Sequence, residues 1–272
     1  MTPGDDDHRF SGDIPQIYEQ YLVPLIFEPY AQDLAARVAE RRPKRVLEIA
    51  AGTGVLTRSL AAALPPSTAI VATDLNTPML QQAQRVGTQR EVHWEQADAM
   101  QLPFSQGEFD LVVCQFGAMF FPDRSGAFAE VWRVLRPGGC LLFNVWDAID
   151  YNTFAACVTA ALDAQFPADP PLFLARVPHG YHDKTRIAAD LARGGFARHA
   201  QIVTLPLPSR ADSARHVAIA YCGGTPLRSE IQTRAPGRLA QVIDDVSAAF
   251  TARFGSGPIE APMQARIVWV ER

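Results

Sequence analysis

Val46-Leu47-Glu48-Ile49-Ala50-Ala51-Gly52-Thr53-Gly54-Val55-Leu56-Thr57 is the stretch that decides the fold. An apolar run, residues 45–50, stops at the two glycines, and a helical pattern over residues 56–64 starts just after them. This succession predicts a strand, a tight turn and a helix. Glycine permits positive φ in such a turn and lets a ligand lie against bare backbone. The helix that follows offers unpaired N–H groups to an anionic or lone-pair-bearing group.

Asp74 follows a second apolar run, residues 69–73. An acidic side chain at the tip of the second strand is where the ribose hydroxyls of a nucleoside would be bound. The two features together predict a nucleoside-cofactor site. A dinucleotide site would also want glycine or alanine three residues after Gly54, where this chain has Thr57.

Glu48 lies inside the first predicted strand, and it completes the pattern Glu-x-Ala-x-Gly-x-Gly with Ala50, Gly52 and Gly54. That pattern resembles the first motif of the class I S-adenosylmethionine-dependent methyltransferases. The resemblance covers residues 45–146 closely and the flanks only in the order of elements. It implies S-adenosyl-L-methionine as the cofactor, S-adenosyl-L-homocysteine as the product, and direct transfer of the methyl group to an acceptor.

Four later motifs agree with this family in order and spacing, which makes the combination far more specific than a lone Gly-x-Gly. Residues 74–80 resemble the acidic ribose ligand and the helix that supplies an apolar adenine contact. Residues 97–104 resemble the loop whose Asp takes the adenine amino group, and residues 109–116 resemble the fourth strand, whose end faces the methionine part. Residues 135–139 resemble the turn before the fifth strand. The resemblance assigns to the cofactor site Tyr18, Glu48, Ala50, Gly52, Gly54, Thr57, Asp74, Leu75, Met79, Asp98, Ala99, Gln115 and Phe116.

The acidic residues also have structural interpretations. Glu48 could cap N–H groups at the strand end, and Asp74 could be an ordinary turn residue. Taken with the glycines, both favour the cofactor interpretation. Asp98 is a common residue type near a strand end, and only the Leu-Pro-Phe that follows it favours the adenine contact. Asp110, at the start of its strand, favours a structural role.

Strand and helix patterns alternate through residue 146, which predicts an α/β, doubly wound sheet with helices on both faces and ligands at the carboxyl ends of the strands. The resemblance extends this to a seven-stranded, mostly parallel, Rossmann-like sheet with an antiparallel last strand and a helical cap. We divide the chain into an N-terminal helical lid segment (1–44), a cofactor-binding core (45–146) and a part that completes the sheet and carries helical acceptor-pocket insertions (147–272), all within one domain. Prolines predict short kinked helices over residues 13–29. Strands are expected at residues 45–50, 69–73, 91–96, 109–116, 139–145, 200–207 and 264–270, and late helices at 211–220 and 239–254.

Composition limits the function classes. The chain has 272 residues, 48% hydrophobic and 20% charged, and a net charge of −4, which gives no electrostatic footprint for nucleic acid. Four cysteines without CxxC spacing favour buried thiols over disulfides or a metal site, and suit a reducing compartment. The acidic N-terminus lacks the apolar region of a signal peptide, and no apolar stretch approaches the ~20 residues of a membrane span. We therefore expect a soluble, cytoplasmic protein; its oligomeric state is open.

Methyl transfer demands mainly alignment of the acceptor with an already activated methyl group. If the acceptor must lose a proton, the candidate general bases are His179 and His182, which flank Tyr181, although a lone loop histidine more often has a structural role. The fourth strand is followed by Gly117 and Ala118 in place of the Asp/Asn-Pro-Pro-Tyr loop of base-amino methyltransferases. We therefore expect a small, partly apolar acceptor, and nucleic acid is disfavoured.

Two alternatives stay open from the sequence. A Rossmann-type NAD(P)-dependent oxidoreductase shares the strand–turn–helix element, although Thr57 and the later motifs weigh against it. A non-catalytic S-adenosylmethionine-binding protein would show the same motifs, because the family has no obligatory catalytic residue.

Overall fold

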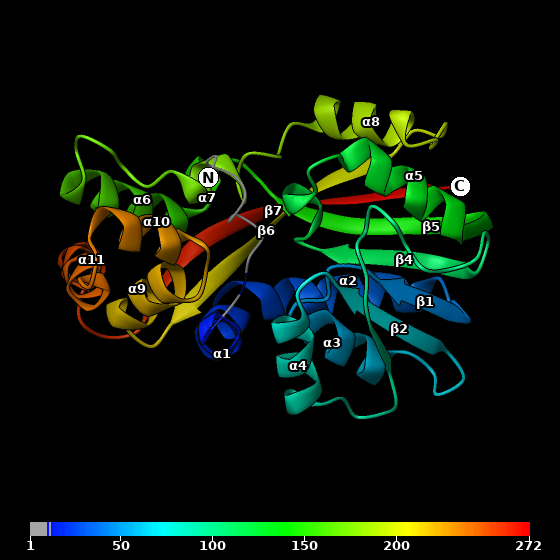
Figure 1. Cartoon of the computed structure of the whole chain (residues 1–272), viewed down its shortest axis with the longest axis horizontal. Coiled ribbons are helices and arrows are strands. Elements are labelled where there is room, and N and C mark those ends of the chain that lie inside the picture. The colour runs from blue at the N-terminus through cyan, green and yellow to red at the C-terminus, as the bar shows by residue number, and fades with distance from the viewer. Residues whose placement is uncertain (1–9, 11) are drawn as a thin grey trace.

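The computed structural model describes Phe10 and residues 12–272, and its centre is one sheet of seven strands in the order β3-β2-β1-β4-β5-β7-β6 (Figure 1). Strand β7 (Ile259–Glu271) lies antiparallel between β5 and β6 (Gln201–Ala211). This confirms the predicted seven-stranded, mostly parallel sheet with an antiparallel last strand. The parallel strands are β1 (Arg45–Glu48), β2 (Ala69–Asp74), β3 (His93–Gln96), β4 (Phe109–Gln115) and β5 (Leu135–Trp146).

The boundaries of β1 and β5 differ from the sequence prediction for local reasons. Strand β1 ends at Glu48, before residue 50, because the backbone turns there and Ala50 has φ of 53°. Strand β5 begins at Leu135, so the expected turn lies inside the strand as an irregularity, where the register with β4 shifts between Phe109 and Leu111. Asp110 accepts the backbone N–H groups of Lys44 and Arg45 there, as its structural interpretation predicts.

Strands β6 and β7 are longer than expected and pair along the whole length of β6, from Gln201↔Trp269 to Ala211↔Ile259. Pro206 and Pro208 do not interrupt β6, since it is an edge strand, and an edge strand tolerates missing N–H donors on its free side. The pair therefore extends beyond the rest of the sheet.

Helices cover both faces of the sheet (Figure 1). Helices α2 (Glu28–Glu40), α3 (Val55–Ala63) and α4 (Thr77–Val86) lie on one face, and α5 (Arg124–Val134) and α8 (Lys184–Arg193) on the other. Helices on both faces of the sheet are the doubly wound arrangement that alternating strands and helices predict.

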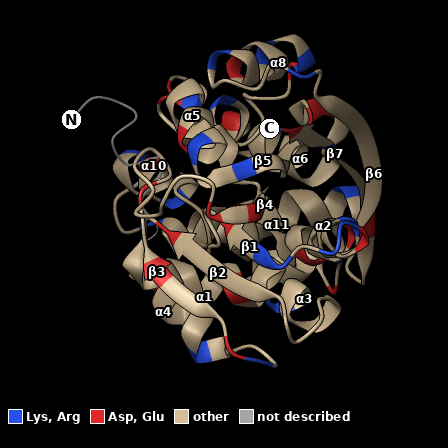
Figure 2. Cartoon of the chain, turned by 90° about the vertical axis from the view of Figure 1, so that its right-hand side faces the viewer, with Lys and Arg blue, Asp and Glu red and all other residues tan. Residues whose placement is uncertain are grey.

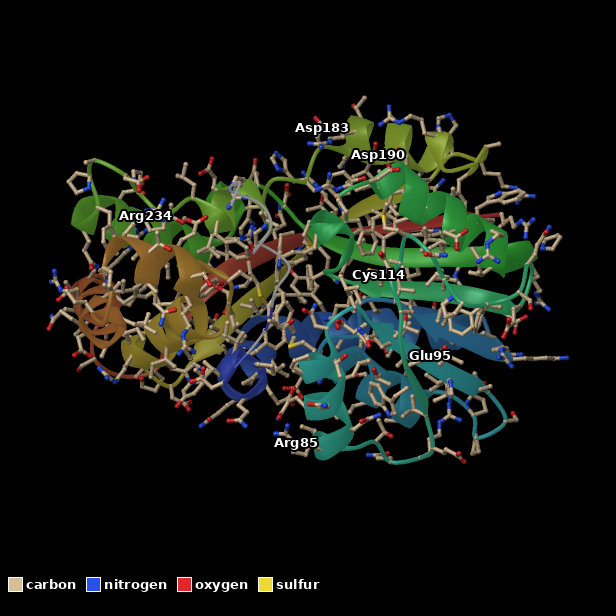
Figure 3. The ribbon with its side chains drawn as sticks, in the orientation of Figure 1. Arg85, Glu95, Cys114, Asp183, Asp190 and Arg234 are labelled. Carbon is tan, nitrogen blue, oxygen red and sulfur yellow. The ribbon has the colours of Figure 1, made fainter. Side chains whose placement is uncertain are left out.

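Asp183 and Asp190 lie on the α8 side of Figure 3. Asp183 caps α8 by accepting the Arg186 N–H, and Asp190 accepts a hydrogen bond from the buried Tyr181 hydroxyl.

A helical cap lies beside the outer halves of β6 and β7. Its α9 begins at Ala214, later than expected, because β6 runs on to Ala211 and Ser213 then accepts the N–H of His216 as the helix cap. Helix α10 was missed from the sequence. The cap comprises α6 (Thr153–Gln165), α7 (Phe173–Arg176), α9 (Ala214–Gly223), α10 (Leu227–Arg234) and α11 (Leu239–Phe254).

The N-terminal segment connects cap and sheet. The short kinked helices expected over residues 13–29 are α1 (Ile14–Ile17) and η1 (Tyr18–Phe27), which continue into α2. Here η1 is a π-helix that contains Pro24. Residues 1–9 and 11 of the expected lid segment lie outside the described residues. Within the described part of the chain, no helix has the length and apolar character needed to cross a membrane.

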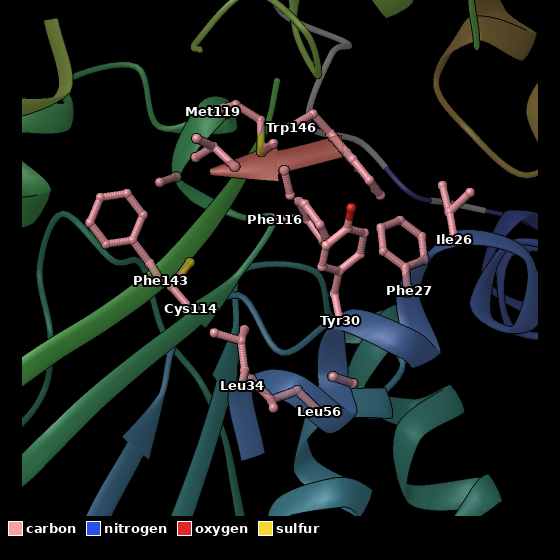
Figure 4. Packing of buried hydrophobic residues seen from close by; sticks show 14 of the residues in the cluster. Ile26, Phe27, Tyr30, Leu34, Leu56, Cys114, Phe116, Met119, Phe143 and Trp146 are labelled. Atoms are coloured by element: carbon pink, nitrogen blue, oxygen red, sulfur yellow. The ribbon is translucent and has the colours of Figure 1, made fainter. Parts of the chain in front are cut away.

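Aromatic side chains fill the space between η1, α2 and the carboxyl ends of β4 and β5 (Figure 4). Phe116 and Trp146 stack with ring centroids 3.8 Å apart, and Tyr30 meets both edge-on. Offset and edge-to-face contacts of this kind add to the free energy of burying the rings. The core thus reaches the strand ends where ligands bind in such sheets.

The loops after β1 and β4 pack against each other at unusually short range. Ala50 and Phe116 both have left-handed backbone conformations, with φ of 53° and 51°. Gly117 lies between them, and a Cβ added there would lie 2.5 Å from Ala50 Cβ and 2.8 Å from Cys114 Sγ. Figure 3 shows Cys114 near the middle of the molecule. These loops therefore leave no room for a side chain at residue 117.

Replacing Gly117 by alanine should lower the free energy of unfolding by about 1–3 kcal/mol, because the two loops would have to separate. Gly257→Ala is the control, since an added Cβ there meets nothing within 4 Å, and it should change stability by less than about 0.5 kcal/mol. Chemical denaturation of both variants measures the difference. Equal stability of the two would show that the loop contact is not tight.

Candidate functional site

A cavity of about 1060 Å³, including its solvent-open part, lies at the carboxyl ends of β1, β2 and β4. We call it the strand-end cavity. It brings together most of the residues that the sequence assigned to a cofactor. Those in its wall are Tyr18, Ala50, Gly52, Asp74, Leu75, Met79, Asp98, Ala99, Gln115 and Phe116.

Asp74 connects the turns that follow β1 and β2. Its Oδ2 accepts the Gly52 N–H at 2.8 Å, and its Oδ1 accepts the Asn76 N–H at 2.7 Å. The carboxyl is buried, and burial raises its pKa, while the two backbone N–H donors act in the opposite direction. The Asn76 side-chain amide also donates to Oδ1, at 3.4 Å, whereas Oδ2 keeps a lone pair for a further donor.

Gly52 forms an open part of the cavity wall. Its φ is 58°, and an added Cβ would have Met79 Cε 3.6 Å away and the Tyr18 hydroxyl 4.0 Å away as its nearest neighbours. A side chain at this position would therefore project into the space between these residues. Glycine keeps that space for a ligand.

Gln115 carries an unsatisfied buried acceptor. Its Nε2 donates to the Phe27 carbonyl at 2.8 Å, which fixes the orientation of the amide. Its Oε1 is buried and has no hydrogen-bond partner among the described residues. A buried acceptor without a partner is costly, so this oxygen in a cavity wall marks a position for a ligand donor.

Three predicted residues lie behind the strand-end cavity and do not line it. Glu48 accepts a hydrogen bond of 2.6 Å from the Thr57 hydroxyl, and both side chains are buried. Burial raises the pKa of Glu48 to about 8. A Cβ on Gly54 would come within 2.9 Å of the Trp94 ring, so this glycine allows close packing of the turn against β3. These residues are placed to support the turn from inside the protein.

Several wall residues of the strand-end cavity were missed from the sequence. Asn76 could have been found from its position at the start of α4, two residues after Asp74. Thr73 lies in β2, and Ala97 and Met100 lie in the loop after β3. The other missed residues come from the segment before α1 and from the stretch after β4, where the sequence shows no periodic pattern. They are Phe10, Gly117, Phe120, Phe121 and Pro122.

A second cavity of about 690 Å³, again including its open part, lies between η1, the cap and β5. We call it the aromatic cavity. Its wall shares Phe10, Tyr18, Phe116 and Phe120 with the strand-end cavity, so the two cavities meet at these rings. Further members of its wall are Leu22, Ile26, Phe27, Trp146, Phe154, Phe173, Leu174, His179 and Tyr221.

The structure separates the two candidate histidines. His179 is buried in the wall of the aromatic cavity, where its Nδ1 bonds to the Asp147 carbonyl at 2.8 Å. Burial lowers the pKa of His179 to about 4. His182 Nδ1 bonds to the His179 carbonyl, and His182 lines neither cavity. The predicted role of His182 as a general base therefore has no geometric support.

Charged side chains are few around these cavities. Acidic and basic residues are interspersed over the ribbon in Figure 2. Among the described residues, Asp74 and Asp98 are the charged members of the strand-end wall, and the aromatic wall has no Asp, Glu, Lys or Arg. A cavity with two acidic side chains thus lies next to a cavity whose described wall has no acidic or basic side chain.

Comparisons with known proteins agree with this geometry. A family model described as a methyltransferase domain matches residues 46–139. The demethylmenaquinone methyltransferase of Thermus thermophilus is 43% identical over 114 residues, which are 41% of this chain and 50% of that protein. The chain thus spans about half the length of that relative. The ubiquinone/menaquinone biosynthesis C-methyltransferase of Ectopseudomonas mendocina is 40% identical over 175 residues, 58% of this chain and 67% of that protein.

Solved structures show the same fold at low sequence identity. A structure from Bacillus halodurans, described as a "putative methyltransferase", superposes with a TM-score of 0.54 at 18% identity, covering 88% of this chain and 97% of that one. Phosphoethanolamine N-methyltransferase 2 of Haemonchus contortus, in complex with S-adenosyl-L-methionine, gives a TM-score of 0.56 at 16% identity, covering 94% of this chain and 56% of that one.

Glu48 should make the stability of the protein depend on pH. Its pKa is about 8 in the folded chain against an ordinary value of 4.5, so between these values the folded state binds a proton that the unfolded state has released. The free energy of unfolding should therefore fall as pH rises through this range, by on the order of 3 kcal/mol. Glu48→Gln, which can still accept the Thr57 hydroxyl, should lack this decrease.

Urea denaturation at several pH values between about 5 and 8 measures the effect. The stability of Glu48→Gln relative to the unmodified protein should rise with pH. Glu91→Gln, at an exposed carboxylate, is the control and should follow the unmodified protein. Parallel curves for all three proteins would contradict the assignment.

Proposed function

Because the chain belongs to the class I S-adenosylmethionine-dependent methyltransferases, we propose that it binds S-adenosyl-L-methionine in the strand-end cavity and transfers the methyl group to a small molecule in the aromatic cavity. The observation that carries this proposal is the shared wall of the two cavities at Phe10, Tyr18, Phe116 and Phe120. A group bound in one cavity can there face a group bound in the other. Transfer between two bound molecules requires this adjacency.

The wall of the strand-end cavity fits the cofactor. The Asp74 carboxylate keeps a lone pair on Oδ2 for a ribose hydroxyl, and Gly52 leaves the backbone open beside it. The Gln115 Oε1, an acceptor without a partner, suits the ammonium group of the methionine part. Met79 and Leu75 offer apolar surface for the adenine ring, and Asp98 an acceptor for its amino group.

In this proposal the protein aligns the acceptor with the methyl group of the cofactor and excludes water from the junction of the two cavities. The sulfonium of the cofactor supplies an already activated methyl group. Phe116 is held by its backbone N–H bond to the Asn144 side chain and by its stack on Trp146. Aromatic faces at the junction attract a cationic group and keep water out.

The acceptor is proposed to be small and largely apolar. The wall of the aromatic cavity is mostly apolar and aromatic, which suits an apolar acceptor. Two relatives are named for methylation in quinone biosynthesis. In this proposal, residues 45–146 provide the cofactor site. Parts of 1–44 and 147–272 enclose the acceptor.

Calorimetric titration tests the cofactor assignment. S-adenosyl-L-homocysteine and S-adenosyl-L-methionine should bind, and NADH should not. Asp74→Ala should weaken binding of the sulfur nucleosides by about 5- to 150-fold, which corresponds to about 1–3 kcal/mol for a lost bond in a buried site. Asp163→Ala, at an exposed acid, is the matched control and should bind normally.

Tight NADH binding without any response to the sulfur nucleosides would instead support the oxidoreductase alternative. Incubation of cell extracts with methyl-labelled cofactor then separates an enzyme from a binding protein. We expect a labelled small-molecule product. Cofactor binding without labelled product from a broad range of extracts would favour a non-catalytic protein.

A further inference from the structure

Three polar side chains in the wall of the aromatic cavity are already hydrogen-bonded within the protein. Asn152 donates through Nδ2 to three carbonyls and accepts the Gln264 N–H through Oδ1. The Thr225 hydroxyl donates to the Tyr221 carbonyl and accepts the Leu227 N–H. The Ser209 hydroxyl donates to the Leu25 carbonyl. These three side chains are therefore bound into the protein itself.

His179 keeps a free acceptor. A backbone carbonyl can only accept, so the bond to the Asp147 carbonyl requires the proton on Nδ1. Nε2 then carries a lone pair, and no described residue bonds to it. The low pKa that burial gives this ring keeps it neutral near pH 7. His179 thus presents an uncharged hydrogen-bond acceptor in the wall of an apolar cavity.

The cavity also disfavours charged ligands. Its described wall has no Lys or Arg to pair with a carboxylate or phosphate, and no Asp or Glu to pair with an ammonium group. Burial of an unpaired charge is far more costly than burial of a neutral polar group. The Tyr221 hydroxyl, which has no partner among the described residues, is a neutral donor.

We propose that the molecule bound in the aromatic cavity is an uncharged, ring-containing compound with a hydroxyl group, and that His179 Nε2 accepts a hydrogen bond from that hydroxyl. The proposal rests on the proposed function and narrows its acceptor to neutral phenol-like molecules. Aromatic rings in the wall, including the stacked Phe116 and Trp146, offer flat apolar surface to such a ring. His179 determines specificity here, because a compound of the same shape without the hydroxyl leaves its acceptor unpaired.

Four naphthalene compounds of similar size test this inference on protein saturated with S-adenosyl-L-homocysteine. They are 2-naphthol, 2-methoxynaphthalene, 2-naphthoate and 2-naphthylmethylammonium. By calorimetry, 2-naphthol should bind about 10-fold or more tightly than 2-methoxynaphthalene, since the latter has no donor. The anion and the cation should bind more weakly than either neutral compound.

Two variants isolate the role of His179. His179→Phe keeps an aromatic ring without an acceptor, and the preference for 2-naphthol over 2-methoxynaphthalene should disappear. His179→Gln keeps an acceptor oxygen and should retain part of the preference. Normal binding of S-adenosyl-L-homocysteine by both variants shows that the cofactor cavity is intact.

The inference is overturned if 2-naphthoate or the ammonium compound binds as tightly as 2-naphthol. It is equally overturned if the unmodified protein does not prefer 2-naphthol to its methyl ether, a comparison that needs no variant, or if the preference survives in His179→Phe. Failure of the unmodified protein to bind S-adenosyl-L-homocysteine would be a different result. That would contradict the proposed function itself.

Discussion

The hydrogen bond from the Gly52 N–H to the Asp74 carboxylate fixes the geometry on which the site depends. It joins the turn after β1 to the end of β2, and the second oxygen of the same carboxylate holds the turn that begins α4. Because the carboxyl is buried, these backbone donors compensate for its lost hydration. Glu48 and Thr57 support the same turn from the opposite side, so the glycine turn is held both from the cavity and from the core.

The central sheet and most of the strand-end cavity could be predicted from the sequence. Alternating apolar runs and helical patterns predict a parallel sheet, and parallel strands bring their carboxyl ends to one edge. Asp74, Asp98 and Gln115 follow or end such runs, so their convergence follows from topology alone. Patterns of this kind do not say which side of a turn a buried side chain occupies. Glu48 and Thr57 were therefore placed in the wall, although they lie behind it.

The aromatic cavity could not be assembled from the sequence, because its wall comes from segments that are far apart in the chain. Phe10, Trp146 and Tyr221 belong to three separate regions and meet only through tertiary packing. The prolines predict an interruption of the helix, and they do not predict that η1 is a π-helix. Similarly, the length of β6 reflects its position at the sheet edge, which a proline-containing run does not reveal. In the aromatic cavity, in η1 and in β6, the local sequence pattern alone does not determine the structure.

The β6–β7 pair extends past the sheet and carries the cap at its far end (Figure 1). Changes in the cap helices can therefore alter the wall of the aromatic cavity without disturbing the register of the parallel strands, which is set by β1 to β5. The four shared aromatic side chains are the places where the two halves constrain each other. In evolutionary terms, mutations in the cap of such a fold can change which molecule it binds, while the site at the ends of the parallel strands stays the same.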